Sequence, residues 1–414
     1  MTQAQALKIM KSGANVFLTG APGAGKTYVL NQFIDWAEQE GYTVAITAST
    51  GIAASHIGGT TIHSWSGLGI ADSLSDEDLA RMANTKRLVK RYKRTDVLVI
   101  DEVSMLHGKR LDMVDRAARH LRKSGKPFGG LQVILVGDLF QLPPVSRDRD
   151  AEFDFVHYSQ AWQQLGLKVC YLTEQHRQAG DDPLLDILQA MRQNALTLEL
   201  RKLLMPRLMA GDDETITRLY SHNIDVDAIN QQHLSALPGK VKTFTMTGRG
   251  EPYKVTALKR NLLAPEVLEL KVGAQVMFVA NNFAEGYVNG SRGQVVAIKK
   301  GKPTVQLLSG QKIEVGKYKW TMKEDGVEVA EVKQVPLRLA WAITIHKSQG
   351  MSLDGAKVDL SKAFMPGMGY VALSRVRSLG GLYLVGLNEV ALQLNDDIFE
   401  FDSQLMAQSE GAEQ

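Results

Sequence analysis

Residues 20–27, Gly-Ala-Pro-Gly-Ala-Gly-Lys-Thr, form the stretch whose residue types and spacing best define a chemistry. The apolar run 15–19 precedes it, and 28–40 follows with apolar residues at helical spacing. A strand that breaks into a glycine-rich loop and opens a helix is typical of a P-loop, whereas a ligand-free glycine turn needs no such setting. Backbone N–H groups wrap the phosphates, Lys26 reaches the β- and γ-phosphates, and the Thr27 hydroxyl binds Mg²⁺. The predicted nucleotide-binding residues here are Gly20, Ala21, Pro22, Gly23, Ala24, Gly25, Lys26 and Thr27.

Two adjacent carboxylates, Asp101 and Glu102, end the apolar run 97–100. In a parallel sheet, the strand ends that carry the P-loop and these acids meet at the same carboxyl edge. Asp101 is then expected to hold Mg²⁺, and Glu102 to orient and deprotonate an attacking water. A kinase would need a pocket for an acceptor substrate instead, so the acid pair favours hydrolysis. Each acid alone is also compatible with an ordinary surface residue at a strand end.

A further apolar run, 133–136, ends in a polar loop that contains Gln141 and two prolines. An amide side chain can donate and accept hydrogen bonds, so Gln141 can sense the γ-phosphate. The double proline holds the loop extended, which allows it to report hydrolysis to a neighbouring element. Positive charge beyond Lys26 has two candidate sources, Arg177 and Arg375. Either arginine alone is more often a surface ion-pair partner than an arginine finger.

The elements that must position these residues follow an α/β pattern over residues 1–175. The expected strands, near-continuous apolar runs typical of parallel sheets, include 44–47, 97–100, 131–136 and 169–172. A second α/β block is expected over 176–237 and 334–405. Between its halves, 238–333 changes to short β-like pieces with frequent glycine, which predicts a small β-barrel or sheet domain. The polar tail 406–414 is expected to be frayed.

Composition limits the class of protein. The chain has 414 residues, 44% hydrophobic and 22% charged, which predicts a globular protein of two or three domains. Its apolar runs are of strand length, so no membrane span is expected. The start of the sequence lacks a signal layout, and a single cysteine, Cys170, fits a reducing cytoplasm. A net charge of +3 neither demands nor forbids nucleic acid. The basic pairs within 86–94 indicate a solvated helix face.

The ordered motifs resemble the petite-integration-frequency (Pif) family of superfamily 1 DNA helicases over nearly the whole chain. Single motifs recur by chance, but this set occurs in family order. The segment most specific to the family is 111–132, with its Pro-Phe-Gly-Gly turn at 127–130. The other matching segments are Gln3 with 20–27, then 47–54, 59–65, 101–105, 137–144, Asn223 with 226–230, 344–350 and 370–375.

This resemblance implies an α/β fold of two RecA-like P-loop domains with parallel sheets and ATP in the cleft. It further implies a wedge insert near 67–94 and a barrel insert in the second domain. Gln3 and Gly350 would contact the nucleotide, and Arg177 and Arg375 would act as arginine fingers. Single-stranded DNA would cross both domains and be translocated 5′ to 3′. The sequence shows no nuclease or relaxase motif.

Several residues near loops are candidates for contact with DNA. His63, Trp65, Phe140 and His346 could stack on bases, although for Trp65 core packing is an equal alternative. Lys347 could meet a phosphate. The remaining expected contacts, from hydroxyl donors or from the resemblance, are Thr50, Ser64, Asn223 and Tyr370. No His/Cys spacing fits a zinc site.

The sequence therefore predicts a cytoplasmic, bacterial or phage-encoded, monomeric 5′-to-3′ DNA helicase that uses ATP and Mg²⁺. Its expected partners are single-stranded DNA and forked or tailed duplex DNA, with no membrane; replication or repair proteins remain open. Two other functions also remain open. One is a translocase that strips proteins from DNA without separating strands. The other is a P-loop loader in which ATP merely switches affinity.

Overall fold

The computed structural model describes residues 1–69, 71–144, 154–174, 182–208, 216–221, 223–260, 262–282, 284–307, 309–324, 327–349 and 351–411. The chain divides into two compact units. The first unit is Met1–Ala179 together with Asn395–Gln414, and the second is Gly180–Leu394. Within the described residues, every helix is too short or too polar to cross a lipid bilayer.

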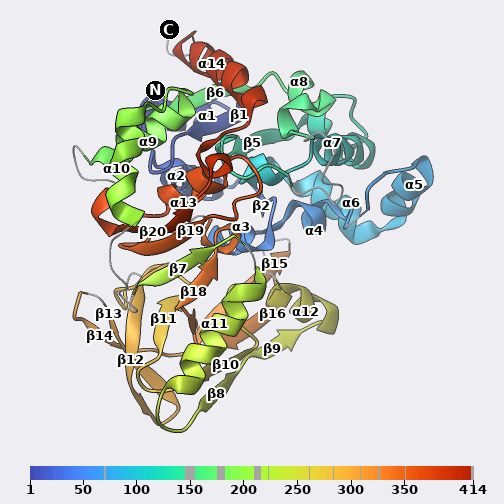
Figure 1. The fold of residues 1–414 in the computed structure, drawn as a ribbon. Helices are drawn as coiled ribbons and strands as arrows, with labels where there is room; N and C mark the ends of the chain where they lie inside the picture. The colour runs from blue at the N-terminus through green and yellow to red at the C-terminus, as the bar shows by residue number, and fades with distance from the viewer. Residues whose placement is uncertain are drawn as a thin grey trace. The chain divides into compact units, whose positions relative to one another are not determined.

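A parallel sheet forms the centre of the first unit (Figure 1). Its strands are β1 Val16–Gly20, β2 Val44–Ala48, β3 Thr60–Thr61, β4 Val97–Asp101, β5 Gln132–Val136 and β6 Lys168–Leu172. The strand order is β3-β2-β4-β5-β1-β6, and neighbouring strands pair in parallel. β5 therefore lies between the P-loop strand β1 and the acid-bearing strand β4. The carboxyl ends of all three strands share one edge, as expected for a site built from their loops.

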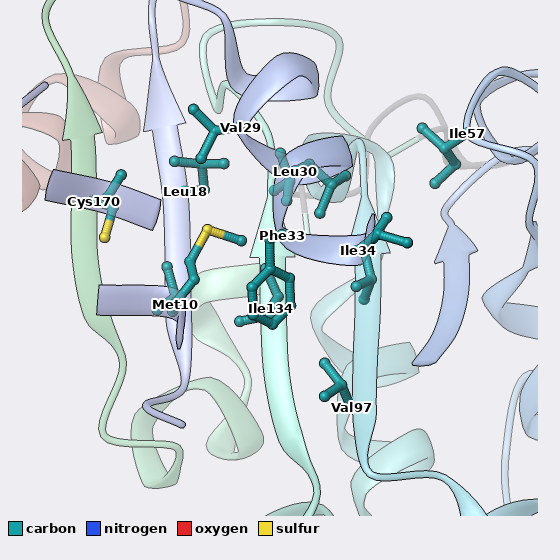
Figure 2. Packing of buried hydrophobic residues seen from close by; sticks show 14 of the residues in the cluster. Met10, Leu18, Val29, Leu30, Phe33, Ile34, Ile57, Val97, Ile134 and Cys170 are labelled. Carbon is teal, nitrogen blue, oxygen red and sulfur yellow. The ribbon is translucent and has the colours of Figure 1, made fainter. Parts of the chain in front are cut away.

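Helices cover both faces of this sheet because successive strand side chains alternate in direction. On one face, Leu18 and Ile134 pack with Met10 of α1 and Phe33 of α2 in a buried cluster (Figure 2). On the other face, the Phe17 ring meets Trp162 of α8 edge-on, with ring centroids 4.8 Å apart. The helices of the first unit are α1 Gln3–Lys11, α2 Lys26–Gln39, α3 Gly51–His56, α4 Ile62–Ser66, α5 Asp76–Asn84, α6 Lys86–Arg94, α7 Gly108–Arg122, α8 Gln160–Gln164 and α14 Asp396–Gly411.

The final helix, α14, lies along the edge strand β6 of the first unit (Figure 1). The backbone N–H of Tyr171 donates to Ser409 Oγ at 3.1 Å, and its hydroxyl lies 3.0 Å from Asp402 Oδ2. The expected placement of 334–405 in the second domain is therefore wrong from residue 395 onward. The expectation of a frayed tail over 406–414 is also wrong as far as residue 411, because this stretch continues a docked helix.

The second unit contains its own parallel sheet of order β18-β7-β19-β20. The strands are β7 Thr217–Tyr220, β18 Ala342–Thr344, β19 Ala356–Leu360 and β20 Leu382–Leu387. The helices of this part are α9 Pro183–Arg192, α10 Leu198–Leu208, α11 Asn223–Ala236 and α13 Met368–Ser374. The segment between β7 and β18 in sequence carries a β-rich insertion, so the sheet is assembled from chain segments on either side of it.

Antiparallel sheets of order β14-β13-β12-β11-β17, β15-β16-β9 and β10-β8 make up that insertion. Phe244, Phe278 and Trp341 belong to its buried cluster. The expected end of the insertion at residue 333 is too early, because β17 still pairs with β11. The elements are β8 Lys242–Thr245, β9 Thr247–Gly250, α12 Pro252–Arg260, β10 Val267–Leu270, β11 Gln275–Phe278, β12 Arg292–Lys299, β13 Lys302–Leu307, β14 Lys312–Glu314, β15 Tyr318–Glu324, β16 Val327–Gln334 and β17 Leu337–Leu339.

Candidate functional site

The glycine-rich loop joins β1 to α2 through backbone conformations that favour glycine. Gly20, Gly23 and Gly25 have φ values of 140°, 91° and 86°, which side chains on L-residues disfavour. Lys26 Nζ donates to the carbonyl oxygen of Gly20 at 2.7 Å and to that of Ala21 at 3.1 Å. The N-cap of α2 is Gly25, which has no side chain to cap the helix, and a helix N-terminus of this kind suits an anion. The loop thus presents backbone donors and an ammonium group together.

Gln3 lies directly against this loop. Its Nε2 donates to the Ala24 carbonyl at 3.1 Å, and its backbone N–H donates to Glu174 Oε2 at 3.0 Å. A Cβ atom at Gly25 would lie 2.0 Å from Gln3 Nε2, so a larger residue there would collide with it. The structure therefore brings Gln3 to the P-loop. Sequence reasoning missed Glu174, although its position two residues after β6 was the available signal.

The two carboxylate residues stand at the end of β4 in an uncommon backbone conformation. Glu102 has φ 51° and ψ 47°, a left-handed conformation that costs energy for a residue other than glycine and is concentrated at functional sites. Its N–H donates to Asp101 Oδ1 at 2.8 Å. Ser49, just after β2, holds the turn: its Oγ donates to the Glu102 carbonyl at 2.7 Å, and its N–H to the Asp101 carbonyl at 3.0 Å.

Electrostatics at this turn favour a bound cation. Burial, followed by the negative charge of Glu102, raises the pKa of Asp101 above its usual range, while Lys26 opposes the shift. A divalent cation beside Asp101 would stabilise its ionised form. Carboxylate and hydroxyl oxygens such as those of Asp101 and Thr27 suit Mg²⁺, which takes few protein ligands and keeps phosphate and water oxygens. Within the described ranges, no cluster of three or more His, Cys, Asp or Glu able to hold a metal occurs.

The loop after β5 carries Gln141 to the same sheet edge. Asp138 is fully buried. Its Oδ1 accepts a hydrogen bond from the Phe140 N–H at 3.2 Å, and its main-chain carbonyl accepts one from the Gln141 N–H at 3.0 Å. The sheet order places this loop between the P-loop and the acids. The strand ends that lead to Lys26, the carboxylate pair and the Gln141 loop therefore share one edge of the sheet, and a site for a triphosphate and a water nucleophile needs such an edge.

Three aromatic candidates for DNA contact are core residues. For Trp65 the core-packing alternative holds, for Phe140 the expectation of base stacking is wrong, and Tyr370 is too buried for the expected DNA contact. The Trp65 ring lies 4.7 Å from that of Tyr92, and Phe140 pairs with a ring of α14. Tyr370 is fully buried, and its hydroxyl accepts a hydrogen bond from Arg192 Nη1 at 2.8 Å. Proximity to a loop in the sequence does not distinguish an aromatic that faces solvent from one that packs underneath.

Other DNA candidates of the first unit are accessible. Ser64 is exposed and His63 is half-buried on α4. Burial, then the positive charges of Arg110 and His107, lower the pKa of His63, which favours the neutral imidazole. Thr50 is half-buried, and its Oγ1 accepts from the Ala53 N–H at 3.2 Å. These residues can therefore offer hydrogen bonds to a phosphate backbone.

In the second unit, His346 and Lys347 are half-buried in the short helix η4 His346–Ser348. Burial, then the charge of Arg338, lowers the pKa of Lys347, and Asp227 opposes the shift. Asn223 begins α11, but its side chain lies outside the described part of the chain.

Of the two candidate arginine fingers, the structure describes Arg375 but not Arg177. Arg375 is buried, with Nε donating to the Val371 carbonyl at 3.0 Å and Nη2 to Ser374 Oγ at 2.8 Å. These partners belong to its own helix, α13. Arg177 and Gly350 lie outside the described residues.

Comparisons with known proteins agree with this geometry. The PIF1-like helicase family matches residues 2–194, and the 2B domain of DNA helicase Pif1 matches residues 255–298. The ATP-dependent DNA helicase Pif1 of Psychrobacter sp. is 41% identical over 95% of this chain and 69% of its own length. Bacteroides sp. Pif1 in complex with ADP-AlF4 has a TM-score of 0.85 and 30% identity, covering 99% of this chain and 97% of that one. Bacteroides Pif1 bound to ssDNA has a TM-score of 0.64 and 30% identity, covering 100% and 98%. The chain therefore belongs to the Pif1 family of ATP-dependent DNA helicases.

Proposed function

We propose that this protein hydrolyses ATP at the P-loop and uses the energy to move 5′ to 3′ on single-stranded DNA and separate duplex DNA. The observation that carries the proposal is that Lys26 and the Asp101–Glu102 pair lie close enough to interact electrostatically, at the sheet edge that also carries the Gln141 loop. The Bacteroides structures with ADP-AlF4 and with ssDNA support ATP and single-stranded DNA as ligands of this chain.

The residues divide the chemistry between them. Glu102 accepts the proton of a water that attacks the γ-phosphorus, and Lys26 stabilises charge on the phosphate oxygens. Gln141 holds that water or the γ-phosphate through its amide. Thr27 and Asp101 would hold Mg²⁺, which supplies further charge neutralisation at the phosphates when bound. The base and the cation ligand are different side chains. Removal of the Glu102 carboxylate should therefore slow hydrolysis while Asp101 and Thr27 can still hold Mg²⁺ and the nucleotide.

Direction and coupling are the finer part of the proposal. His63 and Ser64 of the first unit, and His346 and Lys347 of the second, would grip the DNA backbone. Closure of the two RecA-like domains on ATP would move the DNA-contacting residues of one domain relative to those of the other. When the domains open after hydrolysis, only one of the two sets would release the strand and move along it. Arg177 and Arg375 would then stabilise charge in the transition state. Family resemblance supports this step.

Steady-state hydrolysis of ATP, with and without a single-stranded oligonucleotide, tests the proposal. We expect strong stimulation by the oligonucleotide and turnover that is ~10²–10⁴-fold slower in Glu102→Gln. A P-loop loader that only switches affinity would show little stimulation. A translocase would show stimulation but would not open bare forked duplex DNA, so a strand-displacement assay on the same preparation separates these alternatives.

A further inference from the structure

Helix α6 carries an unusual concentration of positive charge. Its sequence, Lys-Arg-Leu-Val-Lys-Arg-Tyr-Lys-Arg, has six basic residues among nine and no acidic residue. Four of them are exposed, and the three lysines among these, Lys86, Lys90 and Lys93, form what we call the lysine stripe. At 100° and 1.5 Å per residue, they fall within about 60° of arc and about 10 Å of helix length. Within the described structure, none of these three ammonium groups has an ion-pair partner.

The lysine stripe carries a cost in the stability of its own helix. Like charges three and four residues apart repel one another, and Lys86 in the first turn opposes the helix dipole, although Lys93 in the last turn favours it. Thr85, at the N-cap, provides no side-chain hydrogen bond to offset this. A face that served only solubility would mix both signs of charge. Instead, the acidic residues of this region occupy the first turn of the neighbouring helix α5. Folding alone therefore does not explain the stripe.

The buried face of α6 fixes the stripe to α4, the helix that carries His63 and Ser64. Tyr92 is fully buried, and its hydroxyl donates to the Ser66 carbonyl at 3.0 Å. Arg91 Nη1 donates to the Trp65 carbonyl at 2.7 Å. A Cβ at Gly67, the residue that ends α4, would lie only 2.8 Å from Leu88 Cδ2, so the two helices pack closely. Helix α6 therefore packs firmly on α4, and the lysine stripe lies on its outward face, because at 100° per residue it is about 150° from Leu88 and Tyr92.

We propose that the lysine stripe binds the phosphate backbone of duplex DNA next to the single strand held by the first unit. This inference rests on the proposed function. Lysine is a point charge that binds phosphates without reading sequence. Sites for single strands combine positive charge with exposed aromatic rings on which bases stack. All of α6 is described, and its only aromatic residue, Tyr92, is buried. The stripe therefore suits a duplex, whose phosphates suffice for binding.

The test compares two full-length variants with the same loss of charge. One is Lys86→Gln, Lys90→Gln and Lys93→Gln. The control replaces three exposed lysines elsewhere in the first unit, Lys8→Gln, Lys126→Gln and Lys168→Gln. Glutamine is a good helix former and removes repulsion, so α6 should remain folded, which circular dichroism checks. Fluorescence anisotropy then measures binding to a blunt duplex and to a single-stranded oligonucleotide over a series of salt concentrations.

We expect the stripe variant to lose about 10-fold or more in affinity for the duplex at low salt. The slope of log affinity against log salt concentration should become shallower by about 2.7, because each of three lost phosphate contacts accounts for ~0.9. The control variant should match the parent. Affinity for the single strand should change by about 2-fold at most. Equal duplex binding by the two variants would overturn the inference, as would equal losses for duplex and single strand. If the parent binds polyglutamate in a salt-sensitive way, the stripe variant does not, and both bind the duplex equally, the stripe binds an acidic protein instead. If the parent ATPase ignores single-stranded DNA, the proposed function itself fails.

Discussion

The ring of Phe140 lies 5.3 Å from the ring of Phe399, with the two planes at 50°. Phe140 belongs to the loop that carries Gln141, and Phe399 to the first turns of α14. The chain leaves the second unit at Leu394 and enters α14 directly. The candidate sensor loop therefore rests on the helix that begins where the chain returns from the second unit.

Replacement of Phe399 by alanine should loosen this loop and slow hydrolysis. An aromatic pair contributes ~0.5–1.5 kcal/mol, which corresponds to a decrease in kcat of about 2- to 10-fold if the loop must be held in place. KM for ATP should change little because the P-loop is untouched. Phe399→Tyr, which keeps the ring, should restore kcat, and Met406→Ala, at an exposed position of α14, serves as the control. An unchanged kcat in Phe399→Ala would show that the pair is only structural.

Lys26→Ala should abolish hydrolysis and unwinding without disturbing the fold. The Nζ atom of Lys26 donates to the loop carbonyls of Gly20 and Ala21, and we expect its loss to remove charge at the phosphates and little packing. Turnover measured beside a melting curve checks this, with Lys8→Ala on the exposed side of α1 as control. Preserved turnover together with a normal melting curve would disprove the P-loop assignment.

Glu102→Gln should bind ATP but hydrolyse it ~10²–10⁴-fold more slowly, as expected for loss of a general base. Glutamine keeps the size of the side chain, and the backbone bond from residue 102 to Asp101 Oδ1 is unaffected. Binding of a fluorescent ATP analogue and single-turnover hydrolysis separate the two effects. A rate within a few-fold of the parent would place the base on another residue.

His157 should make the first unit sensitive to acid. Its Nδ1 is buried and has no hydrogen-bond partner among the residues that the structure describes, and its ring stacks on Phe401 of α14 at 4.1 Å. Burial lowers the pKa of His157 from 6.5 to about 4. Between these values the unfolded chain binds a proton that the folded chain does not, so stability is lost as pH falls, by at most about 1.4 kcal/mol per pH unit.

His157→Phe keeps a ring against Phe401 and removes the titrating group. Its melting temperature should therefore fall less than that of the parent as pH decreases from 6.5 towards 4. Tryptophan fluorescence reports the change, because the Trp162 ring lies 6.1 Å from that of Phe401. Parallel pH profiles for the two proteins would exclude His157 as the cause.

Patterns confined to a few neighbouring residues were predictable from the sequence. The P-loop and the acids after β4 are of this kind, because a strand, a loop and the start of a helix are local features. Burial of Phe140 was not predictable, since its partner Phe399 is distant in sequence. The docking of α14 on the first unit was missed for a similar reason: an amphipathic helix does not encode which domain covers its apolar face. The left-handed conformation of Glu102 depends on contacts such as Ser49, which bonds to it from another strand end.

Strand displacement on two matched duplexes, one with a 5′ tail and one with a 3′ tail, tests the proposed activity most directly. The parent protein with ATP and Mg²⁺ should open the 5′-tailed duplex and leave the 3′-tailed one intact. Glu102→Gln should bind both substrates and open neither. Efficient opening of the 3′-tailed duplex would contradict the proposed direction. Failure to open either duplex while single-stranded DNA stimulates ATP hydrolysis would contradict strand separation itself.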